Sequence, residues 1–199
     1  VGMAVAERFM AASFNRPGFE MVNHHVYMFA GDGDMMEGIT YEAASLAGHL
    51  KLGKLICLYD DNKITIDGSV DLAYSENTAA RFEAAGWHVQ TVSGADTDLD
   101  AIEKAIQAAR ERTDAPSLVI LKTTIGYGAP HKQNTSGCHG APLGAEEVRG
   151  VKRALGFSED QSFVVPEEVR KTFESLSQKA AKGEADWKTL FAGYAGSFA

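Results

Sequence analysis

A carboxylate and a side-chain amide follow two apolar segments at a spacing that suggests a metal site. Asp32 follows the apolar segment 26–30, and Asn62 follows the apolar segment 55–59, thirty positions after Asp32. A helix-like stretch over 37–50 joins the two segments, so both residues would lie at the carboxyl ends of neighbouring parallel strands. Mg²⁺ prefers oxygen ligands, usually takes one or two carboxylates, and completes its octahedron with phosphate oxygens and water. The spacing therefore predicts a divalent-cation site that binds a diphosphate.

The glycines on either side of Asp32 support this interpretation. Gly31 and Gly33 allow a sharp turn and let a phosphate approach the main chain where no Cβ intervenes. The helix that follows would present free N–H groups to an anion. An ordinary Asp-Gly turn and an ordinary polar Asp-Asn-Lys loop are the alternatives. The strand–helix–strand context favours the metal site, but it does not identify the ligand.

Hydrophobic periodicity and turn residues predict alternating helices and strands. Helices are expected over 2–14, 37–50, 78–85, a segment marked by Leu99, Ile102, Ile106 and Ala109, 145–155 and 166–182. Strands are expected over 26–30, 55–59, 88–92 and 117–125, with a short extended piece at 64–66. This order predicts an α/β fold with a parallel sheet flanked by helices. The Gly-rich stretch 126–144 is a long loop, and loops of that length are more often functional than not.

Composition narrows the class of protein. The 199 residues carry a net charge of −8 and 45% hydrophobic residues, enough for one domain with a real core. The absence of a basic stripe argues against nucleic-acid binding, and no apolar run reaches the ~20 residues of a membrane span. No secretory leader opens the chain, and two lone cysteines, Cys57 and Cys138, indicate a reducing cytoplasm. We expect a cytoplasmic protein.

Several longer stretches of sequence resemble one enzyme family. In chain order, they are Gly31–Gly33, Met35–Ile39, Ser45–Ile56, Tyr59–Gly68, Arg81–Trp87, Thr124–Gly128 and His139–Gly144. Together they are similar to transketolase across roughly residues 1–165, and the pair Asp32 and Asn62 resembles the thiamine diphosphate motif of thiamine-dependent enzymes. The resemblance implies the thiamin diphosphate-binding fold, specifically its diphosphate-binding (PP) module.

The resemblance also implies roles for particular residues. The metal, Mg²⁺ or Ca²⁺, would be bound by the side chains of Asp32 and Asn62 and by the carbonyl oxygen of Ile64. Thiamine diphosphate would contact Gly31, Asp32, Gly33, Asn62, Ile64, Ile66, Ile125 and His139, with Ile66 and Ile125 near its rings. His139 would be the catalytic residue, handling substrate hydroxyls and protons. Glu37 and Glu42 would lie at the interface of a homodimer.

Each of these roles has a simpler alternative. Ile64 and Ile66 alternate with polar residues as in a half-buried strand. The helix dipole alone favours Glu37 in a first turn, and a histidine before Gly-Ala-Pro is usually a loop residue. Asp34 departs from the family, where a small or uncharged residue is usual, so its carboxylate must point away from the diphosphate or cap a helix.

The implied reaction is transfer of a two-carbon ketol unit from a ketose phosphate to an aldose phosphate, as in the pentose phosphate pathway or the Calvin cycle. Dihydroxyacetone synthase and a non-catalytic stable core are the alternatives. Because the chain opens inside a helix with no cap residue, we interpret it as part of a longer enzyme. Residues 1–165 would form the diphosphate domain and 166–199 a helical segment leading onward. We expect the chain alone to be inactive, because the resemblance implies that an activating glutamate lies elsewhere.

Overall fold

The computed structural model describes residues 1–198. They form two compact units, each of which is considered by itself. The first unit comprises Val1–Val5 and His24–Glu159, and the second comprises Ala6–Asn23 and the residues from Asp160 onward. All of the residues that the sequence assigns to a cofactor or metal lie in the first unit. The division of roles at residue 165 stays a prediction.

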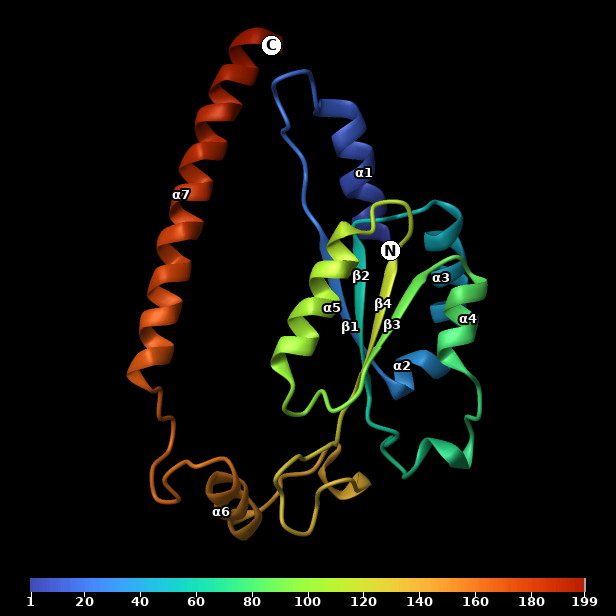
Figure 1. Cartoon of the computed structure of the whole chain (residues 1–199), viewed down its shortest axis with the longest axis vertical. Coiled ribbons are helices and arrows are strands. Elements are labelled where there is room, and N and C mark those ends of the chain that lie inside the picture. The colour runs from blue at the N-terminus through green and yellow to red at the C-terminus, as the bar shows by residue number, and fades with distance from the viewer. Residues whose placement is uncertain (199) are drawn as a thin grey trace. The chain divides into compact units, whose positions relative to one another are not determined.

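The first unit is built on a four-stranded parallel sheet (Figure 1). Its strands are β1 (Val26–Gly31), β2 (Leu55–Asp61), β3 (His88–Val92) and β4 (Ser117–Lys122), in the order β1-β2-β4-β3. The predicted α/β fold with a parallel sheet flanked by helices is therefore confirmed. In the register, Gly31 at the end of β1 lies beside Asp60 near the end of β2. The two segments that carry the expected metal ligands thus begin at the same edge of the sheet.

Successive side chains of β2 point to opposite faces of the sheet, and this divides the core into two layers. Leu55, Cys57 and Tyr59 face the layer formed with α3 (Gly38–His49) and α4 (Thr78–Ala84). Ile56 and Leu58 face the opposite layer, formed with α5 (Leu99–Glu111). Figure 1 shows α5 on one side of the sheet and α3 and α4 on the other. Because β2 is covered on both faces, it is apolar throughout until its last residues, as expected for a central parallel strand.

An unpredicted helix and a shorter strand distinguish the structure from the prediction near the candidate site. The helix expected over 37–50 is confirmed as α3, but a further short helix that was not predicted, α2 (Asp32–Met36), precedes it and is separated from it by Glu37, which has an extended backbone. The strand expected over 117–125 ends at Lys122. Beyond it, the Thr123 N–H donates to the Asp61 carbonyl oxygen and the Thr124 N–H to the Asp96 carboxylate. The chain therefore leaves the ladder of backbone hydrogen bonds where the long loop 123–144 begins.

The remaining elements of the first unit connect these layers. They are two short 3₁₀ helices, η1 (Val70–Leu72) and η2 (Ser136–Cys138), and helix α6 (Ala145–Ala154), which follows the long loop 123–144. The short extended piece expected at 64–66 is reduced to a single bridge between Ile64 and Ser69, closed by a turn in which the Thr65 N–H donates to the Gly68 carbonyl oxygen.

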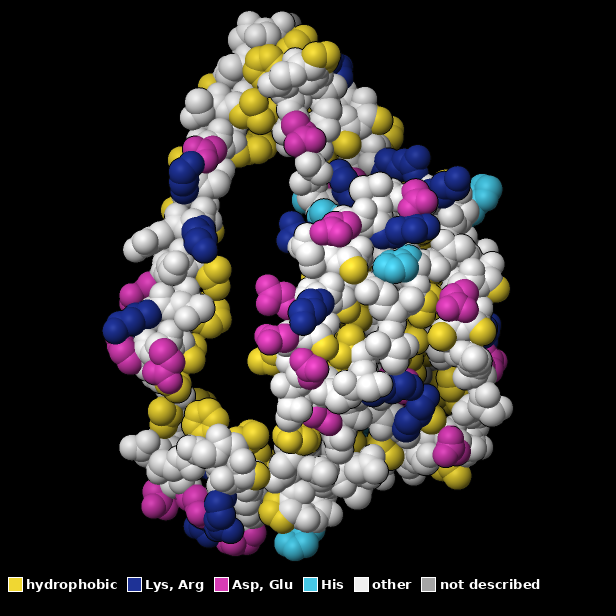
Figure 2. Space-filling view, viewed as in Figure 1, with side chains coloured by type: hydrophobic (Ala, Val, Ile, Leu, Met, Phe, Trp, Pro, Cys, Tyr) yellow, Lys and Arg dark blue, Asp and Glu magenta, His cyan; other side chains and the backbone are white. Residues whose placement is uncertain are grey.

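The second unit joins most of α1 (Gly2–Phe14) to α7 (Glu167–Phe198). Phe19 packs edge-on against Tyr194 and Phe198, and the Trp187 indole N–H donates to the Met21 carbonyl oxygen at 3.2 Å. These contacts explain why α7 continues past Lys182, where the predicted helix ended. Hydrophobic side chains gather along one side of α7 in Figure 2. Among the helices of residues 1–198, none combines the length and apolarity needed to cross a bilayer.

Candidate metal and diphosphate site

Asp32 is the centre of the candidate site. It is the first residue of α2, directly after β1, and its side chain is only 3% exposed. The Tyr59 hydroxyl donates to Asp32 Oδ1 at 2.7 Å, and the N–H groups of Asn62 and Lys63 donate to Oδ2 at 3.1 and 2.8 Å. The carboxylate therefore joins the end of β1 to the loop that follows β2. The structure thus brings Asp32 and Asn62 together, although they lie thirty positions apart in the chain.

The Asp32 carboxylate retains capacity for a cation. Its two oxygens offer about four acceptor positions, and three donors occupy three of them. All three donors are neutral, so the negative charge is oriented but not compensated by them. Burial raises the pKa of Asp32, the hydrogen bonds from Tyr59 and the Lys63 N–H lower it, and the charge of Asp61 raises it. A cation at this carboxylate would offset the cost of burying its charge.

Tyr59 acts as a fixed donor to this carboxylate. Its pKa is raised, first by burial and then by the hydrogen bond to Asp32 and by the nearby negative charges. The phenol is therefore protonated at neutral pH. Tyr59 is 1% exposed and belongs to the core layer beneath α3 and α4, so the sheet itself positions the donor.

The loop that carries Asn62 is held in a strained conformation. Asn62 Oδ1 accepts the Ile64 N–H at 3.0 Å, and between these residues Lys63 has a φ of 64°. This left-handed conformation costs a non-glycine residue on the order of 1 kcal/mol and persists only where surrounding contacts impose it. Here the contacts are the Lys63 N–H on Asp32 and the Val70 N–H on the Lys63 carbonyl oxygen. Such strain is typical of functional loops.

The three expected metal ligands each have a free acceptor position. Asn62 Oδ1 uses one of its two lone pairs for the Ile64 N–H. Within residues 1–198, no hydrogen bond is donated to the Ile64 carbonyl oxygen. One carboxylate oxygen, one amide oxygen and one carbonyl oxygen form an all-oxygen set with a single negative charge. Such a set suits Mg²⁺, which also takes phosphate oxygens and water.

The turn before α2 is open to a ligand. A Cβ added to Gly33 would meet nothing within 4 Å, so the packing of this chain gives no reason for glycine at that position. Asp34 folds back, and its Oδ2 accepts the Gly31 N–H at 2.7 Å. The extra carboxylate thus caps its own helix, one of the two outcomes under which it does not repel a diphosphate.

The other predicted site residues lie outside this cluster. Ile66 is 70% exposed on the turn that follows the Asn62 loop. Ile125 is partly buried at the start of the long loop, where its carbonyl oxygen accepts the Asn134 N–H. His139 is exposed at the end of η2, and its ring forms no hydrogen bond within residues 1–198. Glu37 and Glu42 are exposed at the start and on the surface of α3. No hydrogen bond or ion pair within residues 1–198 joins these five to Asp32.

The long loop is held in place by α6. Glu147 is a largely buried carboxylate that accepts the N–H groups of His131 and Lys132 and contacts His131 Nδ1 at 2.6 Å. These donors, the His131 N–H first, lower the pKa of Glu147. Pro130 lies so close to the helix that a Cβ on Gly150 would be 2.2 Å from the proline Cγ. The loop 123–144, which carries His139, is therefore anchored near its middle.

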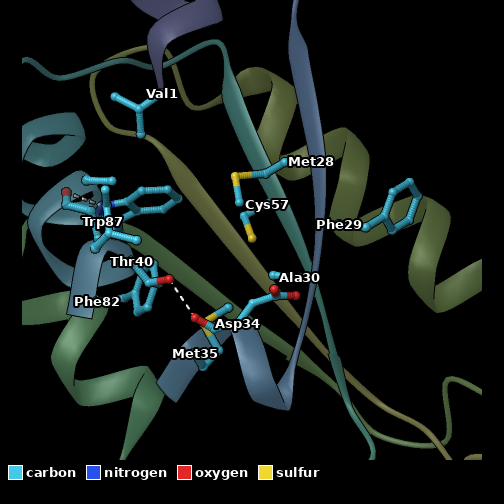
Figure 3. A pocket seen from close by; sticks show the side chains of 13 residues that line it. Val1, Met28, Phe29, Ala30, Asp34, Met35, Thr40, Cys57, Phe82 and Trp87 are labelled. Carbon is cyan, nitrogen blue, oxygen red and sulfur yellow. Dashed lines mark hydrogen bonds between the residues drawn. The ribbon is translucent and has the colours of Figure 1, made fainter. Parts of the chain in front are cut away.

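An apolar cavity of about 290 Å³ lies next to the turn but is a different feature (Figure 3). Its lining includes Asp34 and Thr40, whose hydroxyl donates to the Asp34 carbonyl oxygen at 2.5 Å, and is otherwise almost entirely hydrophobic. Cys57 also lines it, and burial raises the pKa of this thiol to about 12, so the thiol is protonated. The lining does not include Asp32 or Asn62 and offers nothing to a diphosphate.

Four residues around the site were missed at the level of sequence. They are Tyr59, which donates to Asp32, Asp60, which accepts from Asn62, Lys122, which donates to Asp61, and Thr123, whose hydroxyl donates to Asp60. Two signals could have identified them. Tyr59 and Asp60 directly precede Asn62, and Lys122 and Thr123 end the neighbouring apolar strand. Within a parallel sheet, such polar residues at strand ends meet at one edge.

Comparisons with known proteins agree with this geometry. The whole chain, residues 1–199, matches the family described as "Transketolase, thiamine diphosphate binding domain". The transketolase of Geobacillus stearothermophilus is 52% identical over 195 residues, covering 98% of this chain and 29% of that protein. The chloroplastic transketolase of Zea mays is 47% identical over 199 residues, covering 100% and 29%.

Solved structures give the same result. A crystal structure of Pichia stipitis transketolase in complex with sedoheptulose-7-phosphate matches with a TM-score of 0.95 and 45% identity, over 99% of this chain and 29% of that one. Leishmania mexicana transketolase matches with a TM-score of 0.96 and 41% identity over the same shares. The family match and the fold define a thiamine diphosphate-binding domain. The chain belongs to the transketolase family and spans about 29% of the length of these relatives.

Proposed function

We propose that this chain binds Mg²⁺ and the diphosphate of thiamine diphosphate. The protein ligands are the Asp32 carboxylate, the Asn62 amide oxygen and the Ile64 carbonyl oxygen. The observation that carries the proposal is the buried Asp32 carboxylate, held by three neutral donors and joined by two of them to the Asn62 loop. This arrangement orients a negative charge without neutralising it. Three protein oxygens leave three positions of an octahedron for diphosphate oxygens and water, which suits Mg²⁺.

The diphosphate binds next to the metal, over the turn before α2. The Gly33 N–H is in the first turn of this helix, where backbone donors have no partner within the helix. The open space at Gly33 lets an anion reach these donors. Ile66 and Ile125 lie on the turns after β2 and β4, from which they contact the rings of the cofactor.

In the whole enzyme, the reaction is transfer of a two-carbon ketol unit between sugar phosphates. Relatives have been solved in complex with sedoheptulose-7-phosphate and fructose-6-phosphate, which supports sugar phosphates as substrates. Bound thiamine diphosphate supplies the nucleophilic carbon, and this chain orients the cofactor. His139 is exposed and free to contact a substrate hydroxyl. For residues 1–199 alone we propose binding without turnover, which a coupled ketol-transfer assay would test.

The surface of α3 supports a homodimer. Ile39 is 72% exposed and Leu46 48%, and Glu42 lies between them on the same helical face, as spacings of three and four residues require. An exposed apolar face of this kind is more typical of an interface than of a free surface. Glu37 and Glu42 then lie near the symmetry-related subunit.

Titration calorimetry of the chain with thiamine diphosphate, with and without Mg²⁺, tests the proposed binding. We expect binding that depends on the metal, and we expect Asp32→Ala and the isosteric Asp32→Asn to weaken it at least about 100-fold, since both remove the only charged ligand. Asp71→Ala removes the same charge from an exposed position on η1 and serves as the control. Equal affinity of the Asp32 and Asp71 variants would rule out the metal assignment.

A further inference from the structure

The side chain of Asn62 is held in one orientation by two contacts of opposite kind. Its Nδ2 donates to Asp60 Oδ2 at 3.2 Å, and its Oδ1 accepts the Ile64 N–H at 3.0 Å. An ionised carboxylate can only accept, and a backbone N–H can only donate. Both contacts therefore require the same orientation of the amide, with its nitrogen toward Asp60 and its oxygen toward the Ile64 side.

Asp60 is itself fixed to the neighbouring strand. Its Oδ1 accepts the hydroxyl of Thr123, the first residue after β4, so one carboxylate contacts both the Asn62 amide and the end of β4. Asp60 is exposed and makes no ion pair within residues 1–198, which leaves these two hydrogen bonds as its role in the structure.

A second carboxylate reinforces the same junction. The Asp61 side chain is 3% exposed, and its carboxylate pairs with Lys122 at the end of β4 and with Lys63 at 2.9 Å. Its carbonyl oxygen accepts the Thr123 N–H at 3.4 Å. Two lysine side chains thus compensate the buried charge of Asp61. Asp60 and Asp61 both connect the end of β2 to the end of β4, Asp60 through Thr123 and Asp61 through Lys122.

We propose that Asp60 and Thr123 are positioning residues for the metal ligand Asn62. They keep the amide oxygen, and not the amide nitrogen, directed to the cation, and they fix the Asn62 loop to the strand that leads into Ile125. The inference rests on the proposed function, because it assumes that Asn62 ligates the metal. A reversed amide would present an NH₂ group to Mg²⁺, which accepts only oxygen ligands. Outer hydrogen bonds of this kind typically change metal affinity 10- to 100-fold.

Paired variants of the 199-residue chain test the positioning role. Thr123→Val removes the hydroxyl and keeps the shape of the side chain, whereas Thr123→Ser keeps the hydroxyl. Asp60→Ala removes the acceptor, and Asp71→Ala is its charge-matched control on η1. With Mg²⁺ and thiamine diphosphate as the probe in calorimetry, we expect Asp60→Ala to weaken binding about 10- to 100-fold and Thr123→Val about 10-fold. Thr123→Ser and Asp71→Ala should stay within about twofold of the unsubstituted chain.

A measurement without ligand separates this inference from the proposed function. In NMR spectra of the metal-free chain, we expect the Asn62 side-chain NH₂ protons and the Ile64 backbone amide to exchange with solvent at least about 10-fold faster in Asp60→Ala and Thr123→Val. Circular dichroism would verify that each variant is folded. If the unsubstituted chain does not bind the probe, the proposed function is contradicted. The exchange rates of the metal-free chain still test the positioning role in that case. Unchanged exchange in both variants would overturn the inference, whatever the binding data show.

Discussion

The loop after β2 and the loop after β4 both begin at the carboxyl edge of the sheet, but they are built in different ways. The loop after β2 is fastened by two buried carboxylates: Asp32 accepts the Lys63 N–H and is itself fixed by the Tyr59 hydroxyl, and Asp61 pairs with Lys63 and with Lys122 at the end of β4. The loop after β4 runs over 123–144 and is anchored mainly by one carboxylate, Glu147, on a helix outside the sheet. Its last residues before α6 include the exposed His139.

This difference fits the separate roles proposed for the two loops, metal binding for the loop after β2 and substrate contact for the loop after β4. A metal ligand must be held within a fraction of an ångström, so its partners belong to the rigid sheet. A residue that contacts the substrate can lie on a segment of lower local stability, because such segments open and close while the core stays folded. We therefore expect hydrogen exchange to be slower at Asn62–Ile64 than at residues 133–140, and substitutions to affect the two loops separately.

Gly150→Ala should have the largest effect on the loop after β4. The added Cβ would lie 2.2 Å from Pro130 Cγ and 2.6 Å from Cδ, and a proline ring cannot rotate away. We expect a loss of about 2–3 kcal/mol in the free energy of unfolding from this overpacking, measured by urea denaturation. Amide exchange should become faster over residues 126–139 and stay unchanged at Asn62–Ile64.

Gly183→Ala on α7 is the matched control, because a Cβ there meets nothing within 4 Å. Alanine is the better helix former by about 0.5–1 kcal/mol, so this variant should be as stable as the unsubstituted chain or slightly more stable. Equal destabilisation by the two substitutions would show that contact with Pro130 does not anchor the loop.

Tyr59→Phe should destabilise the loop after β2 and leave the loop after β4 unchanged. It removes the hydroxyl that donates to Asp32 Oδ1 at 2.7 Å, and a hydrogen bond to a charged group contributes about 1.5–3 kcal/mol. We expect the free energy of unfolding to fall by about 2 kcal/mol and exchange to increase at Asn62–Ile64. Tyr41→Phe removes a neutral hydroxyl pair with Tyr74 and should cost only about 1 kcal/mol. Faster exchange in the loop after β4 in Tyr59→Phe would argue that the loops are not independent.

The helices and strands of the structure could be predicted from the sequence better than the side-chain contacts of the loops. The strand over 88–92 and the helix over 2–14 match the structure, because periodic apolar positions and flanking turn residues mark them locally. Asp32 and Asn62 were placed at one edge because parallel strands impose it. Tyr59 and Thr123 were not identified, because their particular partners, Asp32 and Asp60, depend on the register of β2 with β1 and with β4, which no local pattern encodes.

The short helix α2, which precedes the helix predicted over 37–50, was missed for a similar reason. Residues 32–36 form α2 because Asp34 caps it through the Gly31 N–H, a contact that spacing alone did not distinguish from a simple turn. The position of His139 relative to the metal site depends on the path of the loop 123–144. That path follows from side-chain contacts such as Glu147 with His131, which lie sixteen residues apart. Long-range polar contacts of this kind cannot be derived from periodicity.

Glu147→Gln should have a smaller effect that depends on pH. The pKa of Glu147 is lowered in the folded chain from its ordinary value of 4.5. The ionised carboxylate therefore stabilises the loop fully above that value, and the contribution is lost as the pH falls through the lower folded pKa. Loop exchange in the unsubstituted chain should thus increase as the pH falls below about 4.5, after correction for intrinsic rates, whereas Glu147→Gln should show fast exchange at all pH values.

Glu146→Gln supplies the control for this pH dependence. Glu146 is the neighbouring residue, is highly exposed and pairs only with Arg149 within residues 1–198. Its loss should leave the pH profile of the loop unchanged, since exposed pairs contribute little. If amide exchange in the Glu147→Gln chain kept the pH dependence of the unsubstituted chain, the loop would be anchored by Pro130 and not by the carboxylate.

His139→Ala should have the smallest effect on stability. The side chain is exposed and has no hydrogen-bond partner within residues 1–198, so its removal should change the free energy of unfolding by less than about 0.5 kcal/mol. His88→Ala is the comparison, because His88 Nδ1 lies 3.2 Å from Ser117 Oγ and its loss should cost about 1 kcal/mol. In a complete enzyme carrying the His139 substitution, turnover should fall while stability is kept, which is the pattern of a residue that contacts substrate. A loss of stability equal to that of His88→Ala would instead make His139 a structural residue, and the loop after β4 would then have to be as rigid as the loop that carries Asn62.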